Sequence, residues 1–178
     1  SFTGTETNKL CMIDGCWFKN LDNGIYGYNG GGGVQEGLII SNCYFHCCKA
    51  GINFDRKVEY SKVTNCVMYK CHFACINNGG NNVFTACTFH GIVGFFIDGT
   101  GYDQTPPAHP NIAHGSCIGC TFNHIDSDTY PTTLGGGDAV KVVNLVSGGF
   151  IFTGCQFWYG NINIQTGYGI AFSDCLFG

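Results

Sequence analysis

Acidic residues are the side chains of this sequence that could carry out hydrolytic chemistry. Cleavage of a glycosidic bond uses two carboxyl groups, about 5 Å apart in retaining enzymes and about 6.5 to 9.5 Å apart in inverting ones. Asp126 and Asp128 are two positions apart, so an extended chain would hold them on one face, about 6 to 7 Å apart. The candidate catalytic residues are Asp98, Asp103, Asp126 and Asp128. The alternative is that an Asp at a bend accepts hydrogen bonds from backbone amides.

The elements that must position these acids are indicated by a motif that occurs seven times. Phe84-Thr-Ala-Cys-Thr-Phe89 is one copy: a large apolar or Cys residue, a mostly polar one, a small or turn-forming one, Cys, any residue, then Phe or once Met. The central cysteines, spaced 20 to 35 residues apart, are Cys16, Cys43, Cys66, Cys87, Cys120, Cys155 and Cys175. Repetition at this period is typical of a solenoid.

The residues around each central Cys choose the type of solenoid. The residue directly before each central Cys is Gly15, Asn42, Asn65, Ala86, Gly119, Gly154 or Asp174. Most of these residue types tolerate a left-handed backbone or form turns. A third run follows about nine residues later, at 24–25, 51–54, 74–76, 95–97 and 161–164. Three short strands and three bends per turn predict an all-β parallel β-helix, with Cys and Phe in interior columns about 4.8 Å apart per step.

The same register places other residues outside. Trp17, Tyr44, Tyr69, His90 and Trp158 fall at outward positions on one predicted strip, directly after the Cys or after the Phe or Met. Aromatic rings on such a strip could stack on the apolar faces of sugars, or pack against an identical chain. An ordinary solvated surface is the third alternative. With Tyr102 from a long insertion, these residues are the candidate substrate-binding set.

Two insertions interrupt the repeats, at about 99–114 and 126–140. Both are expected to leave after a Phe-bearing strand and to protrude on one flank, where long loops are often functional. The glycine-rich segment 28–37 is interpreted as a loop, because it lacks the Lys-Ser/Thr ending of a phosphate-binding loop. At the end of the third run, Asp55, Asn78 and Asp98 form one predicted column, with the two acids about 9 to 10 Å apart.

Composition narrows the possible partners. The net charge is −4 and only 11% of the residues are charged, so no cationic face is available for nucleic acid. No apolar stretch is long enough to insert into a membrane. The 13 cysteines are an odd number and mostly belong to the repeat, so free thiols are expected, without a metal or other cofactor. Free thiols suggest assembly in a reducing cytoplasm, and both ends look cut from a longer chain.

Through its Ser/Thr-Asn/Gly-Cys-x-Phe turns, residues 1–178 resemble the right-handed parallel β-helix superfamily of pectate lyases, polygalacturonases and phage tailspikes. The resemblance implies a single-stranded right-handed β-helix of about seven rungs with protruding loops. Low charge, interior cysteines and outer aromatic residues are most similar to a phage tailspike or tail-fibre segment. Such a segment is expected to be homotrimeric, to belong to the virion after assembly in the host cytoplasm, and to bind bacterial cell-surface polysaccharide.

The sequence indicates the activity less specifically than the fold, because proteins with the parallel β-helix fold have many different functions. A glycoside hydrolase, acting as a polysaccharide depolymerase, is one possibility for the candidate acids. A structural stalk or adhesin segment without catalysis is the second. A secreted pectate-lyase-like enzyme is the third; the polygalacturonase catalytic motifs are absent from the sequence, and Arg56 is the one arginine placed near an acid, Asp55.

Overall fold

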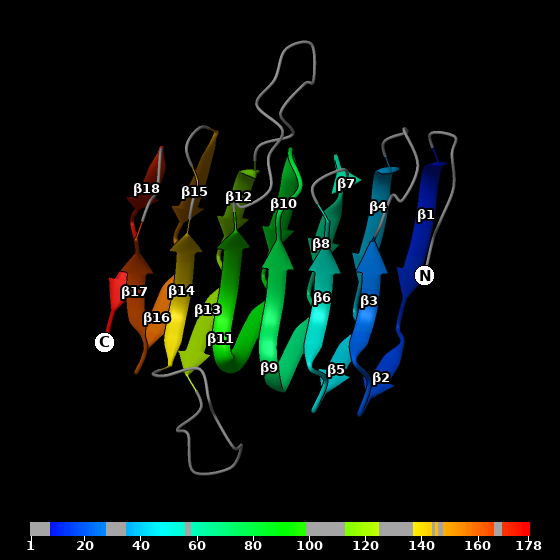
Figure 1. Ribbon diagram of the computed structural model, residues 1–178, viewed down its shortest axis with the longest axis horizontal. Helices are drawn as coiled ribbons and strands as arrows, with labels where there is room; N and C mark the ends of the chain where they lie inside the picture. The colour runs from blue at the N-terminus through cyan, green and yellow to red at the C-terminus, as the bar shows by residue number, and fades with distance from the viewer. Residues whose placement is uncertain are drawn as a thin grey trace.

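The computed structural model describes residues 8–27, 35–55, 58–98, 113–124, 137–143, 145, 148–165 and 169–178. Within these residues the chain is all-β, with strands and no helix. Every strand pairing there is parallel. The strands lie side by side along the long axis of the molecule, from the N-terminal end to the C-terminal end (Figure 1).

The first sheet collects the strands that precede each central Cys. Its order is β1-β4-β8-β10-β12-β15-β18, and β7 (Val58–Glu59) also pairs with β4. The bounds are β1 Asn8–Asp14, β4 Gln35–Ser41, β8 Lys62–Thr64, β10 Asn82–Thr85, β12 His114–Ile118, β15 Gly149–Thr153 and β18 Ile170–Ser173. Each step between neighbours therefore advances the chain by one sequence repeat.

The second sheet collects the strands that follow each Cys, in the order β19-β16-β13-β11-β9-β5-β2, with a second branch of β3, β6, β14 and β17. The strands after the Cys are β2 Trp17–Lys19, β5 Tyr44–His46, β13 Thr121–His124, β16 Gln156–Trp158 and β19 Leu176–Phe177. The branch contains β3 Asn23–Gly27, β6 Ala50–Phe54, β14 Asp138–Val143 and β17 Asn161–Ile164. The long strands β9 (Val67–Asn77) and β11 (Thr88–Asp98) belong to both.

The bend between the first two strands of a repeat has the predicted left-handed step. All seven residues that precede a central Cys have positive φ, between 51° and 63°. Asn42 and Asn65 extend this bend into a side-chain ladder, because Asn65 Nδ2 donates to Asn42 Oδ1 (2.8 Å) and Asn42 Nδ2 donates to Asp14 Oδ1 (2.8 Å). Ser41 Oγ also donates to Asp14 Oδ1 at 2.6 Å, and these two bonds lower the pKa of Asp14.

The central cysteines stack in the predicted column. The backbone N–H of Val67 donates to the carbonyl of Cys43, and that of Thr88 donates to Cys66, each at 2.9 Å. After Cys16, the thiol of each central Cys also lies within reach of a carbonyl in the preceding repeat, as between Cys87 Sγ and Val63 O at 3.5 Å. Cys suits this position because it is small and apolar and carries a weak S–H donor. All 13 cysteines are free thiols.

The aromatic column lies beside the cysteines. Phe89, Phe122 and Phe157 are buried and stack nearly parallel, with centroids 4.8 and 4.7 Å apart and interplanar angles of 10°. The same spacing continues to Phe177 at 5.1 Å, and Phe18 stacks on Phe45 at 4.9 Å. These separations are those of neighbouring strands, so the prediction of a stacked interior column is confirmed.

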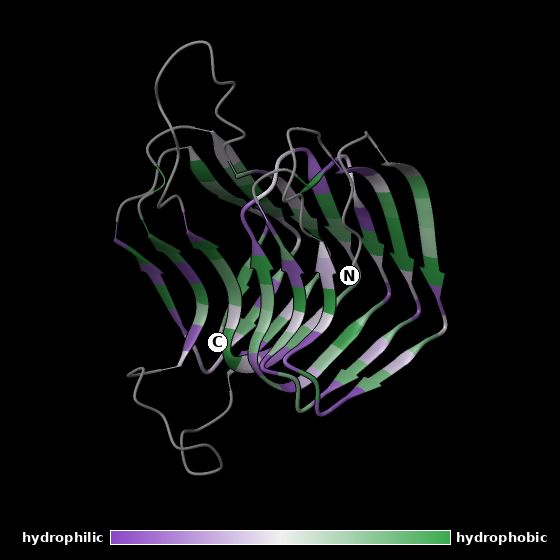
Figure 2. Ribbon diagram, turned by 45° about the vertical axis from the view of Figure 1, so that its right-hand side comes forward, coloured by the Kyte–Doolittle hydropathy of each residue, from purple (hydrophilic) through white to green (hydrophobic). Residues whose placement is uncertain are grey.

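The core lies between the two sheets. Phe84 and Phe150 of the first sheet each contact Phe95 of the second, with centroids 5.1 Å apart in both pairs. Phe152 of the first sheet likewise meets Phe122 at 5.7 Å. Hydrophobic residues form bands across neighbouring strands (Figure 2), which is the pattern expected when equivalent positions of successive repeats are buried together.

The insertions do not leave from neighbouring positions as the sequence predicted. The last described residue before the first insertion is Asp98, which ends β11. The last described residue before the second insertion is His124, which ends β13. His124 is in register with Gly91 near the bend of β11, so six residues of β11 lie between the positions of the two exits. The second insertion is also shorter than predicted, because Asp138–Val143 forms β14 in register with β11.

Candidate functional site: an outer aromatic cluster

Five ring-bearing side chains gather on the outer side of the second sheet. We call them the outer aromatic cluster: Trp17, Tyr44, His46, Tyr69 and His90. Strand pairing aligns Trp17 with Tyr44 and aligns His46 with Tyr69 and then with His90. The buried neighbours Phe45, Met68 and Phe89 point to the core, and side chains alternate along a strand. The cluster residues therefore point outward.

The rings of the cluster contact one another as a continuous surface. Tyr69 stacks on His90 at a centroid distance of 4.7 Å and on His46 at 5.7 Å, with interplanar angles of 15° and 16°. Trp17 meets Tyr44 edge to face at 5.8 Å. Tyr44 lies 6.5 Å from Tyr69, which connects the two groups of rings. Offset and edge-to-face geometries at these distances are attractive, so the cluster holds its own shape.

Lys70 makes polar contacts with two rings of the cluster. The backbone N–H of Lys70 donates to His90 Nδ1 at 3.4 Å, so Nδ1 acts as an acceptor and the neutral ring carries its proton on Nε2. Lys70 Nζ lies 5.5 Å from the centroid of Tyr69, within the range of a cation–π contact. Burial raises the pKa of Tyr44. Its hydroxyl is protonated at neutral pH and can donate a hydrogen bond.

The cluster is open to solvent. Trp17 is 71% exposed, and the four other rings are half-buried. A large exposed Trp beside two Tyr residues is an apolar surface with hydrogen-bonding groups at its edges. This arrangement can contact a flat ligand that has apolar faces and hydroxyl groups.

Trp158 lies in the same row but outside the cluster. It is in register with Asn123, which is in turn in register with His90, so Asn123 separates it from the other rings. Its indole Nε1 donates to Gln156 Oε1 at 3.4 Å. The predicted strip thus consists of two adjacent rows, one with Trp17 and Tyr44 and one with Tyr69, His90 and Trp158. The ring contacts include four of its five predicted members. His46 is the member that the sequence analysis left out of the strip.

The candidate acids are distributed differently from the rings. Asp98 ends β11, and its backbone N–H donates to Asn78 Oδ1 at 2.8 Å. Asn78 in turn donates its backbone N–H to Phe54 O, next to Asp55. The predicted column of Asp55, Asn78 and Asp98 is thus present. Four predicted site residues lie outside the described part of the chain: Tyr102, Asp103, Asp126 and Asp128.

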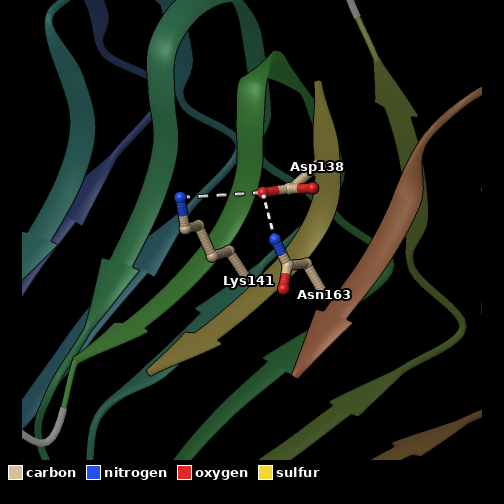
Figure 3. A network of polar contacts seen from close by, with 3 residues as sticks. All are labelled: Asp138, Lys141 and Asn163. Carbon is tan, nitrogen blue, oxygen red and sulfur yellow. Dashed lines mark hydrogen bonds and ion pairs between the residues drawn. The ribbon is translucent and has the colours of Figure 1, made fainter. Parts of the chain in front are cut away.

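One buried acid was not predicted as part of any site. Asp138 is 4% exposed, and its Oδ2 lies 3.8 Å from Lys141 Nζ and accepts a hydrogen bond of 3.3 Å from Asn163 Nδ2 (Figure 3). A buried carboxylate needs such partners to remain charged. The network joins β14 to β17 and serves to hold these strands in register.

A groove lies where β2 and β5 turn toward β3 and β6. Its volume is about 710 Å³, and it is lined by Asn20, Leu21, Asp22, Cys47, Cys48, Lys49 and His72. The sequence did not predict a groove at this bend. The only available signal was that Asp22, Lys49 and His72 each stand six residues after a central Cys.

The described residues narrow the chemistry of the site further. Among them, no three His, Cys, Asp or Glu side chains are grouped closely enough to hold a metal ion. No helix in this part of the chain could span a membrane. Together, the observations define an all-β protein of parallel sheets with a solvent-facing aromatic surface. The chain matches no protein-family model, no curated protein and no solved structure.

Proposed function

We propose that the chain is a single-stranded right-handed parallel β-helix of seven rungs, one for each Cys motif. Consecutive repeats supply adjacent parallel strands to both sheets, and the Cys and Phe columns advance by one strand per repeat. Crossovers between parallel strands of one sheet are right-handed in nearly all proteins, which supports the handedness. This architecture presents equivalent residues of successive rungs as continuous outer rows.

We infer that the β-helix is a receptor-binding segment of a phage tailspike or tail fibre and binds bacterial cell-surface polysaccharide. The outer aromatic cluster is the observation that supports this function. Its rings form a solvent-facing surface across neighbouring repeats, and its two rows are parallel to the axis along which the strands stack. A polysaccharide repeats its apolar ring faces along its length, so several of its sugars could stack on the rings of successive rungs.

Assembly as a homotrimer within the virion, after synthesis in the host cytoplasm, belongs to the same proposal. The free thiols are compatible with folding in a reducing compartment. Hydrolysis of the bound polysaccharide is a separable part of the proposal, assigned to the acids Asp98, Asp103, Asp126 and Asp128. A release of reducing ends from a bound polysaccharide would support that part, and stable binding without release would leave a binding protein.

The binding proposal is tested on an array of bacterial capsular and O-antigen polysaccharides, followed by calorimetry on each polysaccharide that binds. Tyr44→Ala and Tyr69→Ala are expected to weaken binding at least tenfold, because each removes a ring that contacts other cluster members. Trp158→Ala is the matched control: it removes an aromatic residue from the same row but not from the cluster. Binding that is insensitive to both Tyr variants would refute the role of the cluster.

A contact between identical chains is the second use of the cluster. The observation that favours it is the 71% exposure of Trp17, since exposed aromatic residues are enriched in protein interfaces. Under this alternative, Trp17→Ala would shift sedimentation from trimer to monomer. Under the polysaccharide proposal, the same variant would stay trimeric and lose affinity for the polysaccharide.

A further inference from the structure

The groove where β2 and β5 turn toward β3 and β6 brings three charged or ionisable side chains into one row. The backbone N–H of Ala50 donates to Asp22 O, and that of Phe73 donates to Lys49 O, each at 2.9 Å. Asp22, Lys49 and His72 therefore take equivalent places on three neighbouring repeats. The same ladder holds the groove walls, because Lys49 donates its N–H to Leu21 and His72 donates its N–H to Cys48, at 2.9 and 3.0 Å.

The groove contains a cation that the described protein does not neutralise. Lys49 is exposed and, within the described part of the chain, forms no ion pair with Asp22 or with another acid. Lys49 is the charged group that acts directly on His72. Asp22 lines the same groove one repeat further away, and Lys70 stands two residues before His72 on β9. On the other side, β11 contributes Gly91 and Ile92, which carry no charge.

His72 has an unsatisfied polar atom. Its Nε2 is buried and makes no hydrogen bond, while the ring lies parallel to Phe73 with centroids 4.8 Å apart. A buried nitrogen without a partner costs free energy. Because the His72 side chain as a whole is only half-buried, a turn of the ring toward the groove would let a ligand oxygen recover it. Burial, and then the charge of Lys49, lower the pKa of His72, so the imidazole is neutral near pH 7 while the groove is empty.

We propose that this groove is a binding site for the carboxylate of an acidic sugar, with Lys49 as its counter-ion and His72 as its hydrogen-bond donor. The amide of Asn20 and the carboxylate of Asp22 are placed to meet hydroxyl groups of the same sugar. Leu21, which is 43% exposed, offers an apolar surface to its ring. A sugar acid is favoured over a simple anion because Asp22 would repel a ligand that carried charge alone.

The groove continues the surface of the outer aromatic cluster. Cys47, which lines the groove, directly follows His46 of the cluster, so the groove begins where the cluster ends. The inference thus rests on the proposed function and extends it: the bound polysaccharide contains an acidic sugar whose carboxylate enters the groove. It also predicts that an anion near His72 favours the protonated imidazole, so that affinity rises as pH falls.

The test uses NMR titration of the labelled protein with methyl glucuronide, and with methyl glucoside as the neutral match. Glucuronide is expected to shift the amide signals of residues 47–49 and 72 with a Kd on the order of 1 mM, at least five-fold tighter than glucoside. Lys49→Gln should abolish this preference. Lys62→Gln is the control, since it removes an equal charge from an exposed position on β8.

His72→Gln keeps a hydrogen-bonding side chain but cannot be protonated. In this variant, the affinity for glucuronide should no longer rise between pH 7.5 and pH 5.5. Equal binding of the two methyl glycosides, or unchanged glucuronide binding by Lys49→Gln, would overturn the inference. Inorganic phosphate that displaces glucuronide at equal concentration would also overturn it, by showing a site for simple anions.

The failure of this inference is distinguishable from failure of the proposed function. Tyr44→Ala should lose polysaccharide binding yet keep the response of the groove to methyl glucuronide. Polysaccharide binding that depends on Tyr44 and is unaffected by Lys49→Gln would leave the function in place and remove only the acidic-sugar site.

Discussion

Replacement of Ala86 by Asn is expected to stabilise the protein, which is an uncommon outcome for a substitution. Ala86 has a φ of 51°, in the left-handed region where an ordinary L-residue is strained by about 1 to 2 kcal/mol. Asn adopts this region more readily, and it is present at the equivalent positions Asn42 and Asn65, with φ of 54° and 52°. Relief of part of this strain should contribute about 0.5 to 1 kcal/mol.

The second contribution comes from the amide ladder. Asn65 Nδ2 donates to Asn42 Oδ1 at 2.8 Å, and the next step of the ladder is interrupted at Ala86. The Ala86→Asn variant should donate its amide to Asn65 Oδ1, adding about 0.5 to 1 kcal/mol for an exposed hydrogen bond. The sum is about 1 to 2 kcal/mol, or roughly 2 to 8 °C in Tm for a chain of this size.

Urea and thermal unfolding followed by circular dichroism measure this change. Ala86→Gly separates the two contributions, because glycine relieves the strain without adding an amide and also gains entropy in the unfolded chain. Ala171→Asn is the control for asparagine itself, at an exposed strand position where Asn is slightly unfavourable. The reasoning is refuted when Ala86→Asn is no more stable than the wild type, or no more stable than Ala86→Gly.

Two further predictions concern the interior columns. Phe122→Ala should lower the free energy of unfolding by about 3 to 5 kcal/mol, because it empties a fully buried site between two stacked rings. Phe177→Ala should lower it far less, since Phe177 is 56% exposed. Urea unfolding compares the two variants, and equal losses would contradict the buried column. At pH 8, iodoacetamide should modify the exposed Cys16 and spare Cys71. Cys71 is buried, and this burial raises its pKa to about 12. Mass spectrometry locates the adducts, and rapid labelling of Cys71 would contradict its burial.

The repeat motif alone predicted the interior of the protein. A Cys and a Phe separated by one residue point to the same side of a strand, and seven copies of that pair indicated two columns. The residue before each Cys predicted the left-handed step, even for Ala86, because its neighbours in the motif are Gly, Asn and Asp. These features are local, so a single repeat contains nearly all the information that they require.

The outer surface depended on the register between repeats. The motif spacing already placed Asn123 between His90 and Trp158, and the strand register confirms it. The sequence could not show which of the outward rings contact one another. It also missed β14, since the run that begins at Asp138 follows an insertion and breaks the usual spacing of the third strand.

The sequence by itself determined which side chains face inward and where the chain bends, because strand alternation and backbone preference act within a few residues. Only the tertiary structure decided that Asp22, Lys49 and His72 line one groove and that four predicted rings touch. Those contacts join residues more than 20 positions apart. Their distances depend on how many residues each intervening bend uses, as at the irregular step between His90 and Gly91, and no local pattern specifies that number.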